Sequence, residues 1–352
     1  MDLTQYHYPP ITDEQREFAL AFTSVYGKVA KDITWMTATN DTVTVDLANL
    51  DENRSYTIQV YTADPRTSAD YCYLLAEYGN IKGGTKSDFE FDYPTGLQTV
   101  YVSAVSSKGE TYTVGMDVES DKQVMFDGRN IDKTFYYHEP MRYRIIYEGT
   151  IGDDDFDFDY NDLVIEVEYV RGQTSAVVKV LAVGCEWPVR LALRRSATLE
   201  NGEDEDLFKE VHEALGFAGT YDYYSGLYTY LSLNTGRNYT SNVARTVVSL
   251  NSSDLNISIT RFAYQFFTYF AEPADKSGKE DVIKPACIPQ RPGSQSPQAI
   301  LIADPTWEWV YETVKLSASY SLFRYWIDTP SEYPLWYVGT PWLRANDFNA
   351  NN

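Results

Sequence analysis

Apolar and polar side chains alternate along most of residues 33–119, and the alternation has a period of two. The clearest runs are Val43–Leu47, Tyr56–Val60, Val100–Ala104 and Tyr112–Met116. Successive side chains of a β-strand point to opposite faces, so each run predicts a strand with one buried face. Polar turns such as Lys108-Gly109-Glu110 separate the runs, with no helical pattern between them. These residues therefore predict a β-sandwich.

Strands of this length and spacing fit an immunoglobulin-like or fibronectin-like sandwich, which we place at residues 32–120. This topology occurs in adhesins, receptors and spacer modules, so it indicates no function by itself. We assign residues 1–31 to an N-terminal arm and a helix, in which Thr12 and Gln15 have capping-box spacing and Gly27 is expected to end the helix. Its apolar face is formed by Phe18, Phe22, Val25 and Tyr26. A helix this short is expected to dock on the rest of the chain.

A second β-rich unit is predicted for residues 121–352. Strand patterns lie at Arg142–Tyr147, Leu163–Val170 and Ala176–Val183, and helical stripes lie at Asp206–Leu215 and Ser319–Asp328. The fold class is therefore mainly β: an N-terminal immunoglobulin-like β-sandwich, followed by a β-rich, sandwich-like domain with a few short helices.

Composition supports a folded, β-dominated chain. The 352 residues include 30 Tyr, whose rings pack on half-buried strands while the hydroxyls reach water. The excess of 51 acidic over 29 basic residues gives a net charge of −22, which repels phosphate backbones, so we expect no nucleic-acid partner. Cys72, Cys185 and Cys287 are odd in number and widely spaced, which excludes a disulfide scaffold and favours three buried free thiols, with one chance pairing as the alternative.

The sequence contains neither a long apolar run nor a signal-peptide pattern. A transmembrane helix needs roughly 18 or more consecutive apolar residues, and no stretch approaches this length. Because the chain starts on the polar segment Met1-Asp2-Leu3-Thr4, we expect an export signal that has been removed from this sequence. The protein is then expected at the cell surface or outside the cell.

The most unusual segment is Gly152–Asp162, which carries six aspartates between positions 153 and 162 and no basic residue. Phe156, Phe158 and Tyr160 alternate with the acids, so one face is expected to pack while the acidic face binds a cation. Calcium suits this segment because it accepts six to eight oxygen ligands in flexible geometry. Same-face carboxylates on an extended strand lie about 6.5–7 Å apart, so the segment must curl before the strand at Leu163. The predicted ligands are Asp155, Asp157, Asp159, Asn161 and Asp162.

An EF-hand does not fit this segment. With Asp155 at the first loop position, Tyr160 falls where a glycine is required, and Glu166 falls within a predicted strand. A calcium loop at the entry of a strand remains as the prediction, with an acidic turn that holds no ion as the alternative.

Four ordered stretches resemble a known domain. They are Asp157–Val167, Glu210–Gly216, Asn234–Gly236 and Ala318–Tyr337. This set is similar to the LruC domain, which is common in exported proteins of Bacteroidetes and has no assigned biochemical role. The resemblance covers roughly residues 121–342. It departs from the domain's pattern in the longer acidic run Asp153-Asp154-Asp155, which blurs which aspartates are ligands, and in Ser321, where a proline is usual.

The resemblance implies an exported, often lipid-anchored protein of the cell surface. It places Asp157, Asp159, Asn161 and Asp162 on the acidic signature, and it places Glu148 at the acidic position that often precedes it. It supplies no catalytic residue.

Enzyme motifs are missing from the sequence. His212 has no second histidine four positions away, which excludes a zincin, and no nucleophile elbow or phosphate-binding loop occurs. His212 is expected to be a hydrogen-bonded helix residue. A hydrolase that uses two of the many carboxylates is kept as a remote alternative.

A Tyr-rich loop at residues 219–239 offers another function. Tyr221, Tyr223 and Tyr224 are candidates to stack on sugar rings of a surface glycan, whereas Tyr228 and Tyr230 suit a buried strand face. Trp307, Trp309, Trp326 and Trp336 are expected to be packing residues. The sequence thus predicts a non-catalytic, structural or adhesive surface protein that binds calcium. A glycan-binding protein is the alternative, and the partner is a surface glycan or another surface protein.

Overall fold

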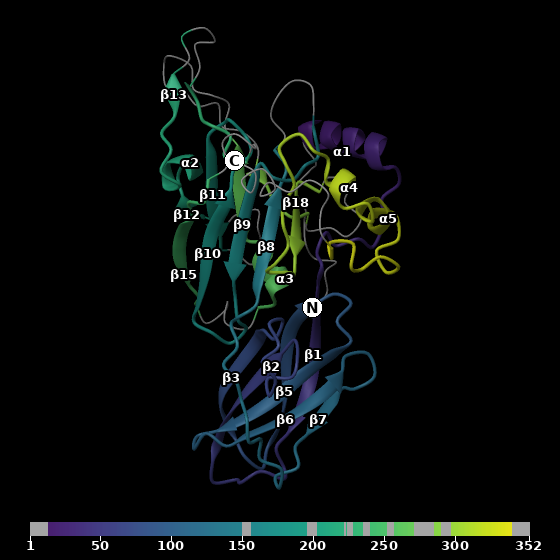
Figure 1. Cartoon of the computed structure of the whole chain (residues 1–352), viewed down its shortest axis with the longest axis vertical. Coiled ribbons are helices and arrows are strands. Elements are labelled where there is room, and N and C mark those ends of the chain that lie inside the picture. Colours follow the sequence, from purple (N-terminus) through teal and green to yellow (C-terminus); the bar gives the residue numbers. More distant parts are fainter. Residues whose placement is uncertain are drawn as a thin grey trace.

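The computed structural model describes residues 13–149, 156–195, 203–221, 223, 228–234, 240–251, 257–270, 285–289 and 297–339. The chain is mainly β, as predicted, and it forms two lobes that lie end to end (Figure 1). We call them the N-terminal sandwich and the second lobe.

The N-terminal sandwich consists of two sheets. One has the order β4-β1-β7 and contains β1 (Ala38–Asp46), β4 (Lys86–Pro94) and β7 (Gln123–Met125). The other has the order β3-β2-β5-β6 and contains β2 (Ser55–Tyr61), β3 (Leu74–Lys82), β5 (Thr99–Ser106) and β6 (Thr111–Asp117). The apolar positions that alternate in the sequence are buried, among them Val43, Ile58 and Val102. Strand β7 pairs in parallel with β1, so residues past position 120 belong to this sandwich.

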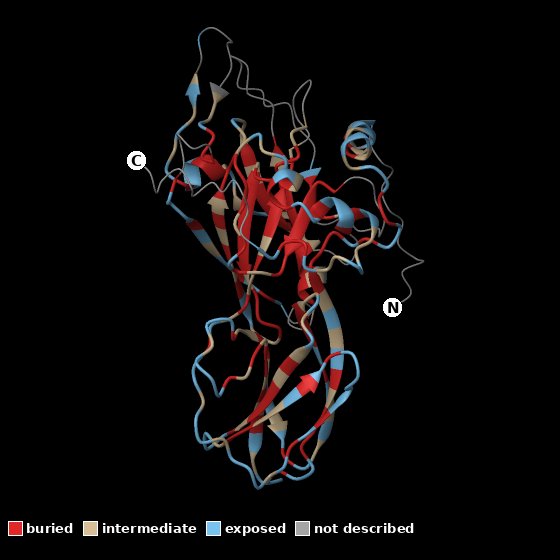
Figure 2. Cartoon of the chain, turned by 45° about the vertical axis from the view of Figure 1, so that its right-hand side comes forward, coloured by how far each residue is buried: buried red, intermediate tan, exposed pale blue. Residues whose placement is uncertain are grey.

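The second lobe contains a five-stranded antiparallel sheet of order β15-β10-β9-β8-β18. Its strands are β8 (Arg142–Tyr147), β9 (Leu163–Glu168), β10 (Ser175–Ala182), β15 (Ala244–Ser249) and β18 (Ala299–Ile302). Strand β9 is central, and its first five residues are buried on both faces (Figure 2). This explains why Leu163-Val164-Ile165 is a continuous apolar run and not an alternating one.

Two smaller sheets complete the second lobe. One has the order β12-β11-β16-β17, with β11 (Val189–Arg194), β12 (Asp204–Phe208), β16 (Phe266–Phe270) and β17 (Pro285–Ala286). The other pairs β13 (Thr220–Tyr221) with β14 (Tyr228–Thr229). The prediction of one helix over Asp206–Leu215 was partly wrong, because Leu207 and Phe208 lie in β12. Only α2 (Val211–Ala214) is helical there, because β12 pairs with β11 as a strand.

The helices are short except for α1 (Asp13–Tyr26), which ends before Gly27 at φ 86°. The others are α3 (Ile259–Ala263), α4 (Leu316–Ser319) and α5 (Phe323–Asp328). The helix predicted for Ser319–Asp328 is confirmed at α5 with Phe323, Trp326 and Ile327 buried, but Leu322 precedes it and is exposed. Among the described residues, no helix is long and apolar enough to cross a membrane.

Helix α1 precedes the N-terminal sandwich in the sequence but packs on the second lobe (Figure 1). Phe18 lies 5.0 Å from Phe156 and 5.5 Å from Phe158, measured between ring centroids. Tyr26 contacts Phe323 of α5 at 5.4 Å. The helix therefore docks, as predicted, and it covers the aromatic face of the acidic segment.

The two lobes are joined by hydrogen bonds and by one buried arginine. Isolated bridges link Met36 with Leu301 and Ala76 with Arg171. The Arg171 side chain forms ion pairs with Glu90 and Asp92 of β4. Asp92 also accepts a hydrogen bond from the backbone N–H of Ile259, at the start of α3, at 2.7 Å. Residues 156–158 of the acidic segment lie against α1, which packs on the second lobe away from this junction (Figure 1).

Candidate metal centre

The acidic segment connects β8 to β9, which pair with Tyr147 opposite Leu163. It curls, as the sequence required. Phe158 and Tyr160 adopt φ angles of 56° and 57°, in the left-handed region that aromatic residues rarely enter. Strained backbone of this kind persists only where surrounding interactions hold it, and it is concentrated at functional sites.

Glu148 holds this curl. Its carboxylate directly follows β8 and is 1% exposed. Oε1 accepts a hydrogen bond from the N–H of Phe158, and Oε2 accepts one from the N–H of Tyr160, both at 2.9 Å. The two left-handed residues therefore both donate to one buried carboxylate.

Asp159 joins the curl to the C-terminal part of the chain. Its Oδ1 accepts from the N–H of Asn161 at 3.0 Å, and its Oδ2 accepts from the N–H of Thr313 at 2.8 Å. Thr313 has a φ of 67°, which is unusual for a β-branched residue. A third residue with a left-handed backbone, Thr313, thus donates its N–H to a buried carboxylate, here that of Asp159.

Glu148, Asp157 and Asp159 each offer an oxygen, and the three oxygens lie within 4.8 Å of one another. Two ligands of one calcium ion, each about 2.4 Å from it, are at most about 4.8 Å apart. Each oxygen has two lone pairs, so an oxygen that accepts a backbone hydrogen bond can still bind a cation. The three carboxylates therefore have the spacing of a metal site.

Asn161 and Glu312 place two further oxygens beside Gly184; Asn161 was a predicted ligand, whereas Glu312 and Gly184 were not predicted from the sequence. Asn161 Oδ1 and Glu312 Oε2 are buried and accept no hydrogen bond from the described residues. Both border Gly184, where an added Cβ would lie 2.1 Å from Asn161 Oδ1 and 2.3 Å from Glu312 Oε2. Only glycine leaves room for these two oxygens, and buried oxygens without a donor require another partner.

Burial raises the pKa of five carboxyl groups around the curl, those of Glu148, Asp157, Asp159, Asp162 and Glu312, and desolvation is the largest cause for each. The pKa of Glu148 and that of Asp159 lie well above the usual range, and neighbouring carboxylates raise both further. The pKa of Asp162 rises to about 7 and that of Glu312 to about 8. The neighbouring charges that act on these groups are all negative.

Other buried carboxylates of the chain have basic partners. Glu166 of β9 lies between Lys179 at 2.8 Å and Arg144 at 3.5 Å. Asp92 lies 4.0 Å from Arg171. Across the described ranges, no Lys, Arg or His forms an ion pair with Glu148, Asp157, Asp159, Asp162 or Glu312. We call these five residues the acidic cluster. A buried charge without a partner is costly, so the acidic cluster fits a cation.

Of the five predicted ligands, Asp157 and Asp159 lie with Glu148 in the group that has metal-ligand spacing. Asn161 and Asp162 belong to the same curl but not to that group, and Asp162 Oδ2 accepts from the N–H of Gly149 at 2.5 Å. Asp155 lies outside the described residues. The acidic cluster contains only oxygen donors, which matches calcium and not zinc.

The Tyr-rich loop is described only in part, and Tyr224 lies outside the described residues. Tyr223 is 84% exposed, and its ring lies 5.2 Å from that of Tyr221, edge to face. Tyr230 stacks on His212 at 4.6 Å.

His212 is buried, as expected for a hydrogen-bonded helix residue. Its Nδ1 contacts Glu210 Oε1 at 2.7 Å, and its Nε2 contacts the carbonyl oxygen of Cys185 at 3.0 Å. Trp307, Trp309, Trp326 and Trp336 are buried, which confirms them as packing residues. None of the three cysteines is paired, although only Cys72 is fully buried.

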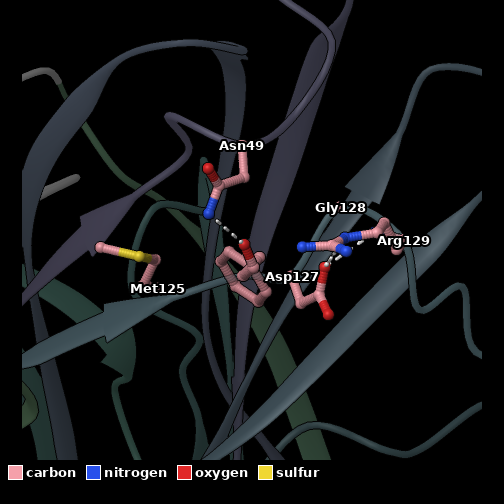
Figure 3. Close-up of a pocket in the computed structure, with 6 residues that line it drawn as sticks. Asn49, Met125, Asp127, Gly128 and Arg129 are labelled. Carbon is pink, nitrogen blue, oxygen red and sulfur yellow. Dashed lines mark hydrogen bonds and ion pairs between the residues drawn. The ribbon is translucent and has the colours of Figure 1, made fainter.

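A pocket of about 470 Å³ lies in the N-terminal sandwich, lined by Asn49 and residues 125–129 (Figure 3). Asn49 Nδ2 donates to the carbonyl oxygen of Phe126 at 3.2 Å, and Arg129 pairs with Asp127 at 3.4 Å. Because these polar groups satisfy one another, the pocket offers weaker evidence for a ligand than the acidic cluster does.

Comparison with known proteins gives no further assignment: no family matches this chain, and no functionally described protein matches it either.

Proposed function

We propose that this chain is a non-catalytic, exported surface module whose second lobe is stabilised by calcium at Glu148, Asp157 and Asp159. The observation that carries the proposal is the convergence of two buried carboxylates and one half-buried carboxylate without a basic partner, near the buried Oδ1 of Asn161, which accepts no hydrogen bond from the described residues. Calcium suits a site built from carboxylate and amide oxygens, whereas magnesium retains more of its water. Asp155 remains a predicted additional ligand.

The role that we propose for the ion is structural. The acidic cluster takes residues from the end of β8, from the curl before β9 and from the segment before α4, so a bound cation would cross-link parts of the chain far apart in sequence. Glu148 and Asp159 are at most 1% exposed, which leaves a substrate no direct access to them and disfavours the hydrolase alternative. Export and a surface location are supported by the resemblance to the LruC domain.

Thermal unfolding tests the proposal. We expect calcium to raise the unfolding midpoint by roughly 10 °C over the metal-free protein, since a ligand at a thousandfold excess over its Kd stabilises by about 4 kcal/mol. The double substitution Asp157→Ala with Asp159→Ala should remove this rise. Glu166→Gln is the matched control: it removes a buried carboxylate that has basic partners, so it should lower the midpoint but keep the calcium response. An equal midpoint with and without calcium in the unsubstituted chain would contradict the proposal.

A second proposal is that the surface module binds a glycan. It is favoured by the exposed ring of Tyr223, which has one face available to stack on a sugar. We expect signal on a glycan array that Tyr223→Ala removes and that Tyr71→Ala, at a tyrosine 69% exposed in the N-terminal sandwich, retains. A blank array would leave another surface protein as the proposed partner.

A further inference from the structure

We infer that the acidic cluster binds two cations, the second at a subsite formed by Asn161 and Glu312 beside Gly184. This inference rests on the proposed calcium site. It adds a ligand set that contains no residue of the triad Glu148, Asp157 and Asp159.

The distances between the carboxylate oxygens limit how many of them can bind one ion. Oxygens that bind one calcium ion lie at most about 4.8 Å from one another. Within the described part of the chain, Glu148, Asp157 and Asp159 form the one group of three acidic residues that meets this limit. Neither Asp162 nor Glu312 extends the group. Since the carboxylate of Glu312 does not reach all three members, one ion cannot use the whole acidic cluster without a rearrangement.

Asn161 Oδ1 and Glu312 Oε2 are buried oxygens that accept no hydrogen bond from the described residues. Asn161 is fully buried, and its amide nitrogen donates to the carbonyl oxygen of Val310 at 3.2 Å, which fixes the direction of Oδ1. Oδ1 therefore points to the side where Glu312 Oε2 and Gly184 lie. Asn161 Oδ1 and Glu312 Oε2 both lie within 2.3 Å of the position that a Cβ on residue 184 would occupy. Two oxygens this close together repel each other unless a cation or a proton lies near them.

The acidic cluster has more carboxylates than one divalent cation can neutralise. When all five are ionised they carry five negative charges, of which one divalent cation leaves three without compensation. A second divalent cation reduces this excess to one.

Equilibrium dialysis against calcium chloride tests the inference, with bound calcium counted by mass spectrometry. The buffer contains about 0.15 M KCl, which screens weak binding to the acidic surface. We expect two calcium ions per unsubstituted chain and one in Gly184→Ala, whose added methyl group occupies the space beside Asn161 Oδ1 and Glu312 Oε2. Gly79→Ala is the control, since an added Cβ there meets no atom within 4 Å, and it should keep two ions.

If Gly184→Ala does not fold, Glu312→Gln tests the second subsite in its place. This substitution preserves side-chain volume, and the variant should also bind one calcium ion. Glu332→Gln, at an exposed glutamate, is its control and should bind two. One ion in the unsubstituted chain would overturn the second subsite and leave the proposed calcium site intact. No bound ion would overturn both. Two ions in Glu312→Gln would place the second ion elsewhere and would overturn this assignment.

Discussion

The two lobes of this protein carry negative charge in opposite ways. In the N-terminal sandwich, acidic side chains lie beside basic ones: Asp41 with Lys122 at 2.6 Å and Asp64 with Arg66 at 2.8 Å near the surface, and the buried Asp92 with Arg171 at 4.0 Å. Others accept backbone N–H groups in turns, and such bonds lower the pKa of Asp51 and Asp117. In the second lobe, two members of the acidic cluster, Glu148 and Asp159, are buried and the other three are half-buried. The cluster has no basic partner among the described residues, and the pKa of every member is raised.

This comparison shows which part of a strongly acidic composition points to a cation. A net charge of −22 is compatible with a solvated surface that binds nothing. Glu166 shows that a buried acid can also be satisfied by lysine and arginine alone. Burial without a basic partner is the informative combination, and in the described residues it is found around Asp159.

The largest expected effect is a loss of order that is confined to one lobe. Removal of calcium should leave several negative charges without a counter-ion in the second lobe only. Hydrogen exchange followed by mass spectrometry should therefore show faster exchange in residues 156–168 and 309–319 and unchanged protection in β2 and β5. The effect should be reversible on addition of calcium.

Magnesium at the same concentration is the control, because it dehydrates reluctantly and should restore less protection. Equal loss of protection in both lobes would show that the ion acts on the whole chain. The distinction drawn between the lobes would then be wrong.

The next effect is a dependence of stability on pH in the calcium-free protein. The pKa of Asp162 is about 7 and that of Glu312 about 8 in the folded chain, against about 4 when unfolded. Between these values the folded state binds more protons than the unfolded state, so the free energy of unfolding should fall as pH rises from about 4 to about 8. The expected decrease is on the order of a few kcal/mol.

Denaturant unfolding of metal-stripped protein at pH 5, 6, 7 and 8 measures this decrease. With calcium bound, the carboxylates stay ionised in the folded state, so the same series should be flatter and the calcium-induced gain should grow with pH. Asp162→Asn should reduce the part of the decrease that falls between about pH 4 and pH 7, where the folded and unfolded states differ in protonation of this carboxyl. A free energy of unfolding that rises with pH in the metal-free protein would have the wrong sign for these carboxylates.

Much of the fold could be predicted because its signals are local. Strand β8 covers Arg142–Tyr147, the range that alternation in the sequence indicated, and Gly27 ends α1 where expected. The helix expected at Asp206–Leu215 was partly wrong because ten residues with an apolar stripe suit a strand followed by one helical turn equally well. Tertiary contacts, which local pattern does not contain, decide between the two.

The candidate site could be predicted only in part, for the same reason. Asp157, Asp159, Asn161 and Asp162 stand close together in the sequence, and their charge density identified them. Glu312 lies some 150 positions away, and Gly184 has no feature that marks it. Aromatic residues rarely adopt the left-handed backbone conformation, so the sequence does not predict it at Phe158 and Tyr160. The structure shows it, together with its cause: Glu148 accepts hydrogen bonds from both N–H groups.

The smallest expected effect comes from a carboxylate in the N-terminal sandwich. Asp41 pairs with Lys122, whose side chain is 58% exposed, and water screens such a pair. Asp41→Asn keeps an oxygen that can accept the N–H of Thr42, as Oδ1 does at 2.7 Å, and it loses only the screened charge. The free energy of unfolding should therefore change by no more than about 0.5 kcal/mol, and the response to calcium should not change.

Asp159→Asn makes the same chemical change in the acidic cluster and should remove most of the calcium response. Denaturant titrations of both variants with and without calcium measure the two responses. If Asp41→Asn and Asp159→Asn changed the free energy of unfolding equally, the burial of Asp159 without a basic partner would have no energetic consequence, and this distinction between the lobes would be wrong.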